Sequence, residues 1–239
     1  MNLIIDIGNT LIKFALFKGQ TLLFQGKGNL ADFKSFLTNK SCKNAIISSV
    51  VKGDEVNQLV ESHNVEKLIE LSHKTKIPVN NTYKTPKTLG DDRLANVIGA
   101  NSLYPNKNVL VIDAGTCIKF DAISKDGEYF GGAISPGLMM RFQALEHFTG
   151  KLPLVEPKNA IDLIGNSSEN SILSGVVNGT VAEIEGIIAQ YNQVYENLTV
   201  ILTGGDASFF DKELKSNIFV EPNLTLIGLN EILRYNTTA

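Results

Sequence analysis

The sequence predicts an α/β protein built from two copies of one unit, each with a mixed sheet flanked by helices. The first reason is a repeated pattern: the apolar run Leu3–Ile5 leads into Asp6–Thr10, and the run Val109–Ile112 leads into Asp113–Thr116. The second reason is that each run continues as a strand-rich meander followed by alternating helical and extended segments. Ligands of such sheets bind in crevices at strand ends, so we expect a ligand-binding cleft between the halves.

The first half, residues 1–107, begins with three predicted strands and continues with alternating helices and strands. Turn residues separate the strands, and apolar residues at 30, 33, 36 and 37 follow helical spacing. The predicted strands are Leu3–Asp6, Leu11–Phe17, Thr21–Gln25, Ala45–Val51 and Lys67–Leu71, and the predicted helices are Leu30–Thr38, Asp54–Ser62 and about Gly90–Tyr104.

The second half, residues 108–239, repeats this plan. Pro136 introduces one helix, and apolar residues at helical spacing, interrupted by glycines, indicate a long one after residue 170. The predicted strands are Val109–Asp113, Ile118–Ile123, Tyr129–Ile134, Thr199–Leu202 and Ile218–Val220, and the predicted helices are Leu138–Phe148, Ser171–Tyr195, Ala207–Leu214 and Leu226–Tyr235.

Composition narrows the functional classes. The chain has 239 residues, 43% hydrophobic and 20% charged, and a net charge of −3, which argues against broad binding to nucleic acid. Cys42 and Cys117 lie in different halves without metal-ligand spacing, so we interpret both as reduced core residues. We recognise no signal peptide and no run of transmembrane length, and we expect a cytoplasmic protein that binds neither membrane nor nucleic acid.

The two Asp-x-Gly turns are the first candidates for chemistry. The chain has no Walker-type phosphate loop, so phosphate must be held in another way. In each turn a carboxylate and a hydroxyl flank a glycine, where the backbone can approach a ligand closely. A single turn of this kind has a purely local explanation, but a matched pair can hold a polyphosphate and its metal ion. Lys13 either reaches the phosphate or is a solvated strand residue.

A third glycine-rich segment is Leu202–Ala207, with the sequence LTGGDA. A strand ends in two glycines and a helix begins with Asp206 as its expected N-cap. Gly204 and Gly205 would let an adenine or ribose lie against the backbone. A plain strand-to-helix loop remains the alternative.

The segment Thr88–Arg93 places two carboxylates and an arginine at a helix start. Asp92 can accept a proton from a substrate hydroxyl during phosphoryl transfer, and the planar fork of Arg93 suits a substrate carboxylate. An acidic helix N-terminus alone would explain Asp91, but it explains a cation at Arg93 poorly. The residues thus indicate a phosphoryl-transfer enzyme and leave its substrate open. Another kinase, a phosphatase, or a regulatory protein that keeps the fold without catalysis are the alternatives.

Over essentially its whole length the chain resembles the type III pantothenate kinases. The resemblance rests on several ordered motifs: DIGNTLIK at Asp6–Lys13, GDDR at Gly90–Arg93, DAGT at Asp113–Thr116, GGAISPGL at Gly131–Leu138 and GGDA at Gly204–Ala207. It implies duplicated ribonuclease H-like (actin-like ATPase) units. It also implies ATP-dependent phosphorylation of pantothenate to 4′-phosphopantothenate, the first step of coenzyme A biosynthesis, and a homodimer.

The resemblance also implies roles for individual residues. Asp92 would be the proton acceptor, Asp6 would bind Mg²⁺ directly or through water, and Asp113 would bind a monovalent cation, K⁺ or NH₄⁺. The implied ATP contacts are Asp6, Ile7, Gly8, Asn9, Thr10, Leu11, Ile12, Lys13, Thr116, Gly204 and Gly205. The implied pantothenate contacts are Tyr83, Gly90, Asp91, Asp92, Arg93 and Ser168, where the serine stands in the position of a family threonine.

Overall fold

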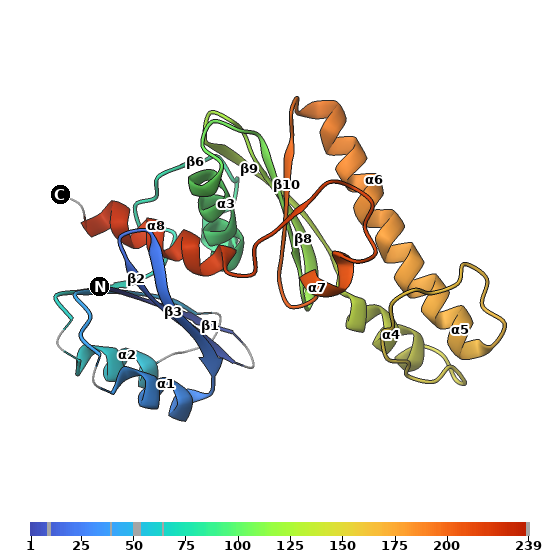
Figure 1. The fold of residues 1–239 in the computed structure, drawn as a ribbon, viewed down its shortest axis with the longest axis horizontal. Helices are drawn as coiled ribbons and strands as arrows, with labels where there is room; N and C mark the ends of the chain where they lie inside the picture. Colours follow the sequence, from blue (N-terminus) through green and yellow to red (C-terminus); the bar gives the residue numbers. More distant parts are fainter. Residues whose placement is uncertain (9–10, 39, 50–53, 64, 238–239) are drawn as a thin grey trace. The chain divides into compact units, whose positions relative to one another are not determined.

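The computed structural model describes residues 1–8, 11–38, 40–49, 54–63 and 65–237. The chain forms two compact units (Figure 1). The first comprises Met1–Pro105, Gly127–Phe130 and Asn223–Ala239, and the second comprises Asn106–Asp126 and Gly131–Pro222. The last segment of the chain therefore belongs with the first unit.

The first unit contains a mixed five-stranded sheet in the order β3-β2-β1-β4-β5. Strand β1 runs antiparallel to β2 and parallel to β4, because a tight turn joins β1 to β2 whereas helix α1 connects β3 to β4. Asn29 begins α1 with a capping box that Asp32 completes. The elements are β1 (Asn2–Ile7), β2 (Ile12–Lys18), β3 (Thr21–Gly28), α1 (Leu30–Leu37), β4 (Asn44–Ser49), α2 (Asp54–Glu61), β5 (Lys67–Glu70), β6 (Asn80–Asn81), η1 (Pro86–Thr88), α3 (Asp91–Leu103) and α8 (Leu224–Thr237).

Helices cover both faces of this sheet (Figure 1). Leu3, Ile5 and Ile7 of β1 point into a buried cluster with Phe33 of α1 and Val60 of α2. Because successive side chains of a strand alternate between faces, Ile4 and Asp6 point to the other side, where α8 packs on β1 and β4. Asp6 therefore lies on the face that α8 covers.

Helix α8 also packs closely on α3, through two glycines (Figure 1). A Cβ on Gly228 would overlap the Ala95 carbonyl, and one on Gly99 would lie 2.6 Å from the Leu224 carbonyl oxygen. Consequently α3 is buried over Arg93–Ala100, on nearly every side. Its N-terminus is held in place by this packing.

The second unit has the same plan. Its strands follow the order β11-β10-β7-β8-β9, and the first residues of β9, counted in the first unit, pair with β6. The sheet's inner side chains pack with α4, α6 and α7 around Phe120, Phe142 and Phe210. The elements are β7 (Val109–Ala114), β8 (Cys117–Ile123), β9 (Glu128–Pro136), α4 (Leu138–His147), α5 (Ser168–Leu173), η2 (Ser174–Asn178), α6 (Gly179–Val194), β10 (Thr199–Thr203), α7 (Ala207–Phe210) and β11 (Phe219–Val220).

The sheet orders confirm the predicted duplication. The order of the first sheet becomes that of the second when its five strands, β1 to β5, are replaced in turn by β7 to β11. Helices α3 and α8 then correspond as well, since each follows the last strand of its set. The division at residues 107 and 108 stays a prediction. The compact units are composed differently, because α8 packs on α3.

Two predicted helices differ in extent from those in the structure. The helix predicted at Ser171–Tyr195 is a continuous run from Ser168 to Val194 whose turn Ser174–Asn178 is a π-helix. Helix α7 ends at Phe210, short of the predicted Leu214, and irregular turns follow it. The end of the strand predicted at Ala45–Val51 lies outside the described residues.

Among the described residues, one helical run, 168–194, is long and apolar enough to cross a membrane, by length and composition only. Its apolar side chains, including Leu173, Val177 and Ile184, lie in the core of the second unit. That is the pattern of a core helix in a globular unit.

Candidate active site

Asp6 stands near the end of β1, directly opposite Lys13 on β2. Its carboxylate is mostly buried, with 13% of the side chain exposed, and lies 4.0 Å from the Lys13 ammonium, which is 51% exposed. At this distance and exposure the pair is a loose one. The lysine can therefore turn toward a ligand at small cost.

The turn after Asp6 is closed by a hydrogen bond from the Gly8 N–H to the Leu11 carbonyl, 3.1 Å long. Ile7 and Ile12, predicted ATP contacts, have buried side chains in the core, so they can offer only backbone groups to a ligand. Leu11 is exposed. Asn9 and Thr10, also predicted to contact ATP, lie outside the described residues.

Helix α3 begins at Asp91 with Gly90 as its N-cap and no side-chain cap. The Arg93 N–H donates to Asp92 Oδ1 at 2.8 Å, so one carboxylate satisfies part of the helix end. A Cβ on Gly90 would lie 2.6 Å from that same oxygen. Gly90 thus leaves the space in which the Asp92 carboxylate lies.

Asp91 carries the electrostatic signature of this site. Burial, with smaller contributions from the negative charges of Asp92 and Asp6, raises the pKa of its carboxyl from 3.8 to about 6. The first-unit sheet and α3 therefore bring Asp6, Asp91 and Asp92 within electrostatic reach of one another. Clustered carboxylates with a raised pKa are typical of a functional site that receives a cation. Among the residues that the structure describes, no group of three or more His, Cys, Asp or Glu is arranged to hold a metal by itself.

Arg93 is buried, with 5% exposed, although it is a cation near a helix N-terminus. Its guanidinium carbon lies 5.5 Å from the centre of the Tyr83 ring. That ring stacks on Tyr129, with centroids 6.3 Å apart and planes 9° from parallel. The Tyr83 ring attracts the guanidinium by a cation–π interaction, and Tyr129 packs against that ring. Gly90, Asp91, Asp92, Arg93 and Tyr83, predicted to contact one substrate, all belong to the first unit, and Tyr129 joins them unpredicted.

In the second unit, Asp113 stands directly across the β7–β8 hairpin from Lys119. The Lys119 ammonium lies 2.9 Å from Asp113 Oδ2, and the two side chains are only 20% and 16% exposed. Sequence reasoning missed Lys119. Lys119 corresponds to Lys13 of the first unit, which the sequence analysis did consider. Because the turn between β7 and β8 is one residue shorter than the turn between β1 and β2, the two lysines lie at different spacings from their aspartates.

Three glycine-containing loops pack against each other at this end of the second sheet. Gly204 has a φ of +98°, and a Cβ on it would overlap the Ala114 carbonyl and lie 2.6 Å from Asp113 Oδ1. The Asp206 N–H donates to the Ala114 carbonyl at 2.9 Å, and the Gly137 N–H donates to that of Thr116 at 3.1 Å. Asp113, Thr116, Gly204 and Gly205 thus meet at the carboxyl ends of two adjacent parallel strands. Thr116 and Gly205 are exposed there.

Ser168 is the first residue of α5 and is exposed. The neighbouring Ser167 caps that helix by accepting from the Asn170 N–H. The Ser168 hydroxyl is therefore not the one that caps the helix. It belongs to the second unit, unlike the other predicted pantothenate contacts.

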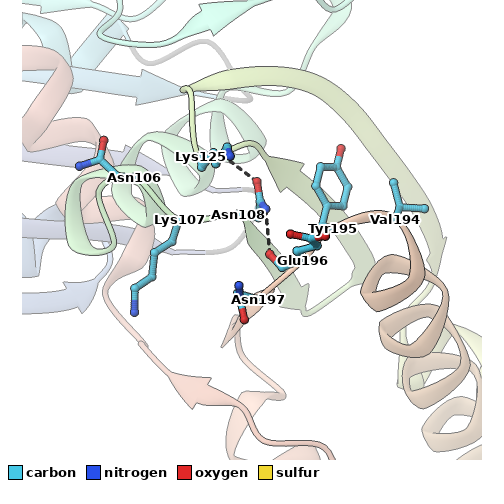
Figure 2. A pocket seen from close by; sticks show the side chains of 8 residues that line it. All are labelled: Asn106, Lys107, Asn108, Lys125, Val194, Tyr195, Glu196 and Asn197. Atoms are coloured by element: carbon cyan, nitrogen blue, oxygen red, sulfur yellow. Dashed lines mark hydrogen bonds between the residues drawn. The ribbon is translucent and has the colours of Figure 1, made fainter.

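A cavity of about 360 Å³ lies elsewhere in the second unit (Figure 2). Asn108 is one of the residues that line it. Its side-chain amide donates a hydrogen bond to the Glu196 carbonyl and accepts one from the Lys125 backbone N–H. Asn108 precedes β7, Glu196 precedes β10 and Lys125 follows the antiparallel β8, so the cavity lies at the opposite strand ends from Asp113 and Gly204. Ligands of parallel strands bind at carboxyl ends, which separates this cavity from the candidate active site.

Solved structures share the whole fold. A Campylobacter jejuni protein described as a candidate transcriptional activator of the Baf family aligns with a TM-score of 0.65 and 20% identity, over 99% of this chain and 100% of its own. A glucokinase from an Antarctic psychrotroph aligns with a TM-score of 0.54 and 13% identity, over 98% of both chains. At these identities the likeness concerns the fold. The fold is that of the actin-like ATPases and sugar kinases.

Within that class the sequence comparisons are specific. A profile of type III pantothenate kinases matches residues 2–190. The type III pantothenate kinase of Phocaeicola vulgatus is 48% identical over 99% of both chains, and that of Christiangramia forsetii is 46% identical over 100% of both. The chain belongs to the type III pantothenate kinase family.

Proposed function

We propose the residues by which this chain performs the reaction of its family, the ATP-dependent phosphorylation of pantothenate to 4′-phosphopantothenate. This reaction is the first step of coenzyme A biosynthesis, and it transfers a phosphoryl group to an alcohol. The observation that carries the assignment of residues is the gathering of Asp6, Asp91 and Asp92 at the N-terminus of α3, beside a buried arginine.

Each unit offers groups that are suited to a nucleotide. In the first unit, the turn from Asp6 to Lys13 offers backbone N–H groups and the Lys13 ammonium to the phosphates. In the second unit, the exposed Thr116 hydroxyl contacts phosphate, and Gly204 and Gly205 leave room for the nucleoside. Support comes from the packing of these two second-unit loops at the carboxyl ends of β7 and β10.

Magnesium fits the first-unit site by the chemistry of its donors. Mg²⁺ prefers carboxylate oxygens, keeps several waters and is usually held by one or two carboxylates together with substrate phosphates. Asp6 would hold it, directly or through water, and its mostly buried carboxylate is suited to that role. When bound, the ion neutralises charge on the transferring phosphoryl group.

Pantothenate carries both a carboxylate and a primary hydroxyl, and the α3 N-terminus offers a partner for each. Arg93 binds the carboxylate with its planar fork, which Tyr83 holds in orientation. Asp92 accepts the hydroxyl proton at its carboxylate as the phosphoryl group is transferred. Gly90 and Asp91 border the same site, and the exposed Ser168 hydroxyl is available to form a hydrogen bond with pantothenate.

The assembly and location of the protein are part of the proposal. Phe148, Leu163 and Ile164 of the second unit are 82%, 79% and 84% exposed, and they flank the segment that leads to Ser168. Exposed apolar side chains of this size favour an interface. We therefore propose a homodimer. The cytoplasmic location and the lack of contact with nucleic acid or membrane are proposed from the composition alone. Light scattering coupled to gel filtration tests the dimer, since a monomeric mass at micromolar concentration contradicts it.

The test of the function is ATP turnover by the purified protein with Mg²⁺, with and without pantothenate. The expected result is turnover only with pantothenate, with 4′-phosphopantothenate as the product by mass spectrometry. Equal turnover in the two cases would indicate a phosphatase. Turnover that appears only with a sugar or acetate would indicate another kinase of the same fold.

A further inference from the structure

We propose that the Lys119 ammonium is a built-in monovalent cation at Asp113, so that turnover by this enzyme needs no added K⁺ or NH₄⁺. The inference rests on the proposed function and on the family resemblance, which implies a monovalent cation at that carboxylate. It changes the source of the cation from the solvent to the chain itself.

The geometry of the pair is that of an occupied site. Lys119 Nζ lies 2.9 Å from Asp113 Oδ2, a charge-assisted hydrogen-bond distance, and both side chains are mostly buried. The two residues are directly opposite in the β7–β8 register, so neither side chain must bend to reach the other. A cation from solvent would have to displace this ammonium or share the carboxylate with it.

The other oxygen of Asp113 is also in use. A Cβ on Gly204 would lie 2.6 Å from Asp113 Oδ1, so this oxygen packs on the backbone at Gly204, in the loop that is predicted to contact ATP. An uncompensated carboxylate at that position would repel the phosphates of an incoming nucleotide. The role of a monovalent cation here is therefore to neutralise Asp113. A primary ammonium has the same charge as NH₄⁺ and also donates hydrogen bonds.

The first unit provides an internal comparison. Lys13 occupies the matching position opposite Asp6, but its ammonium is 4.0 Å away and its side chain 51% exposed, against 20% for Lys119. The same topological position therefore serves two purposes. Lys13 is placed to turn toward phosphate, whereas Lys119 is committed to its carboxylate.

The experiment measures pantothenate-dependent turnover in K⁺, NH₄⁺ and tetramethylammonium chloride at one ionic strength. For the wild type we expect rates within about twofold in the three salts. For Lys119→Ala we expect a loss of about tenfold or more in tetramethylammonium, with recovery in K⁺ or NH₄⁺. Lys125→Ala is the matched control, because it removes an exposed lysine from the loop after the same strand and should behave as wild type.

A second measurement needs no turnover. The midpoint of thermal unfolding is compared in K⁺ and in tetramethylammonium, because an ion that binds only the folded state raises it. We expect K⁺ to raise the midpoint of Lys119→Ala and to leave that of the wild type unchanged. If Lys119→Ala fails to fold, Lys119→Met keeps the aliphatic stem and replaces it in both measurements.

Several results would overturn the inference. They are strong activation of the wild type by K⁺, a folded Lys119→Ala that is equally inactive in every salt, and a Lys119→Ala as active as the wild type in tetramethylammonium. Absence of pantothenate-dependent turnover in the wild type would instead contradict the proposed function. In that case a K⁺ effect on the unfolding midpoint confined to Lys119→Ala would still support the cation role of Lys119.

Discussion

The guanidinium of Arg93 lies over the ring of Tyr83, with 5.5 Å between the guanidinium carbon and the ring centre. This relationship explains how a buried cation is tolerated at the start of a helix, where the macrodipole disfavours it. The neighbouring carboxylates and the ring together stabilise the charge.

Replacing Arg93 by lysine should raise the KM for pantothenate by about tenfold or more while changing kcat less, since lysine lacks the bidentate fork. Steady-state kinetics with pantothenate varied at saturating ATP measure this. Tyr83→Phe is the matched control, because it keeps the ring beneath the guanidinium, and its KM should stay near that of the wild type. An unchanged KM in Arg93→Lys would mean that the carboxylate is held elsewhere.

Asp92→Asn should lower kcat by about a hundredfold or more, the usual scale for loss of a general base. The amide oxygen of asparagine can still accept from the Arg93 N–H, so the helix start should remain intact. ATP affinity, measured by calorimetry, should therefore stay close to that of the wild type. A rate near the wild type's would show that the attacking hydroxyl needs no base, which a loose transition state permits.

Asp91→Asn should stabilise the folded protein at pH 7 to 8 by roughly 1–2 kcal/mol. The pKa of Asp91 is raised from 3.8 to about 6 by folding. Between pH 3.8 and about pH 6, the folded state therefore binds more protons than the unfolded state. The contribution of Asp91 to the free energy of unfolding therefore falls as pH rises from about 4 to 6. Urea unfolding of both proteins across this range measures it. A difference between them that does not change with pH would contradict the raised pKa.

Gly204→Ala should destabilise the second unit by roughly 2 kcal/mol or more and weaken ATP binding, because a Cβ there meets the Ala114 carbonyl at a positive φ. The adjacent Gly205→Ala is the control, since a Cβ at Gly205 meets nothing within 4 Å. Its unfolding free energy should change by no more than about 0.5 kcal/mol. Equal effects of the two substitutions would mean that the loop relaxes freely at both positions.

The sequence predicted the strands and helices of both units because apolar periodicity is a local property. It also indicated the carboxylate–arginine cluster, because an acidic helix start explains Arg93 poorly, and the two Asp-x-Gly turns, because they occur as a matched pair. Lys119 was missed for a geometric reason. The register pairs Ile7 with Ile12 in the first hairpin but Ala114 with Ile118 in the second. A search for the spacing between Asp6 and Lys13 therefore finds no lysine at the same distance from Asp113.

The partner of the last helix could not be predicted from its own pattern. An amphipathic segment indicates that one face is buried, but not against which element. The close approach of Gly228 to Ala95 and of Gly99 to Leu224 in the structure shows that α8 belongs with α3. The π-helical turn at Ser174–Asn178 was hidden for a similar reason, since its apolar spacing fits an α-helix equally well.

The position of α8 determines the order in which the chain can fold during synthesis. Domains usually fold as units while the ribosome is still at work, the N-terminal one first. Here the sheet of the first unit is complete by residue 70, yet the helix that packs on β1 and β4 begins at Leu224. The first unit therefore lacks α8 on its sheet until the whole second unit has been translated.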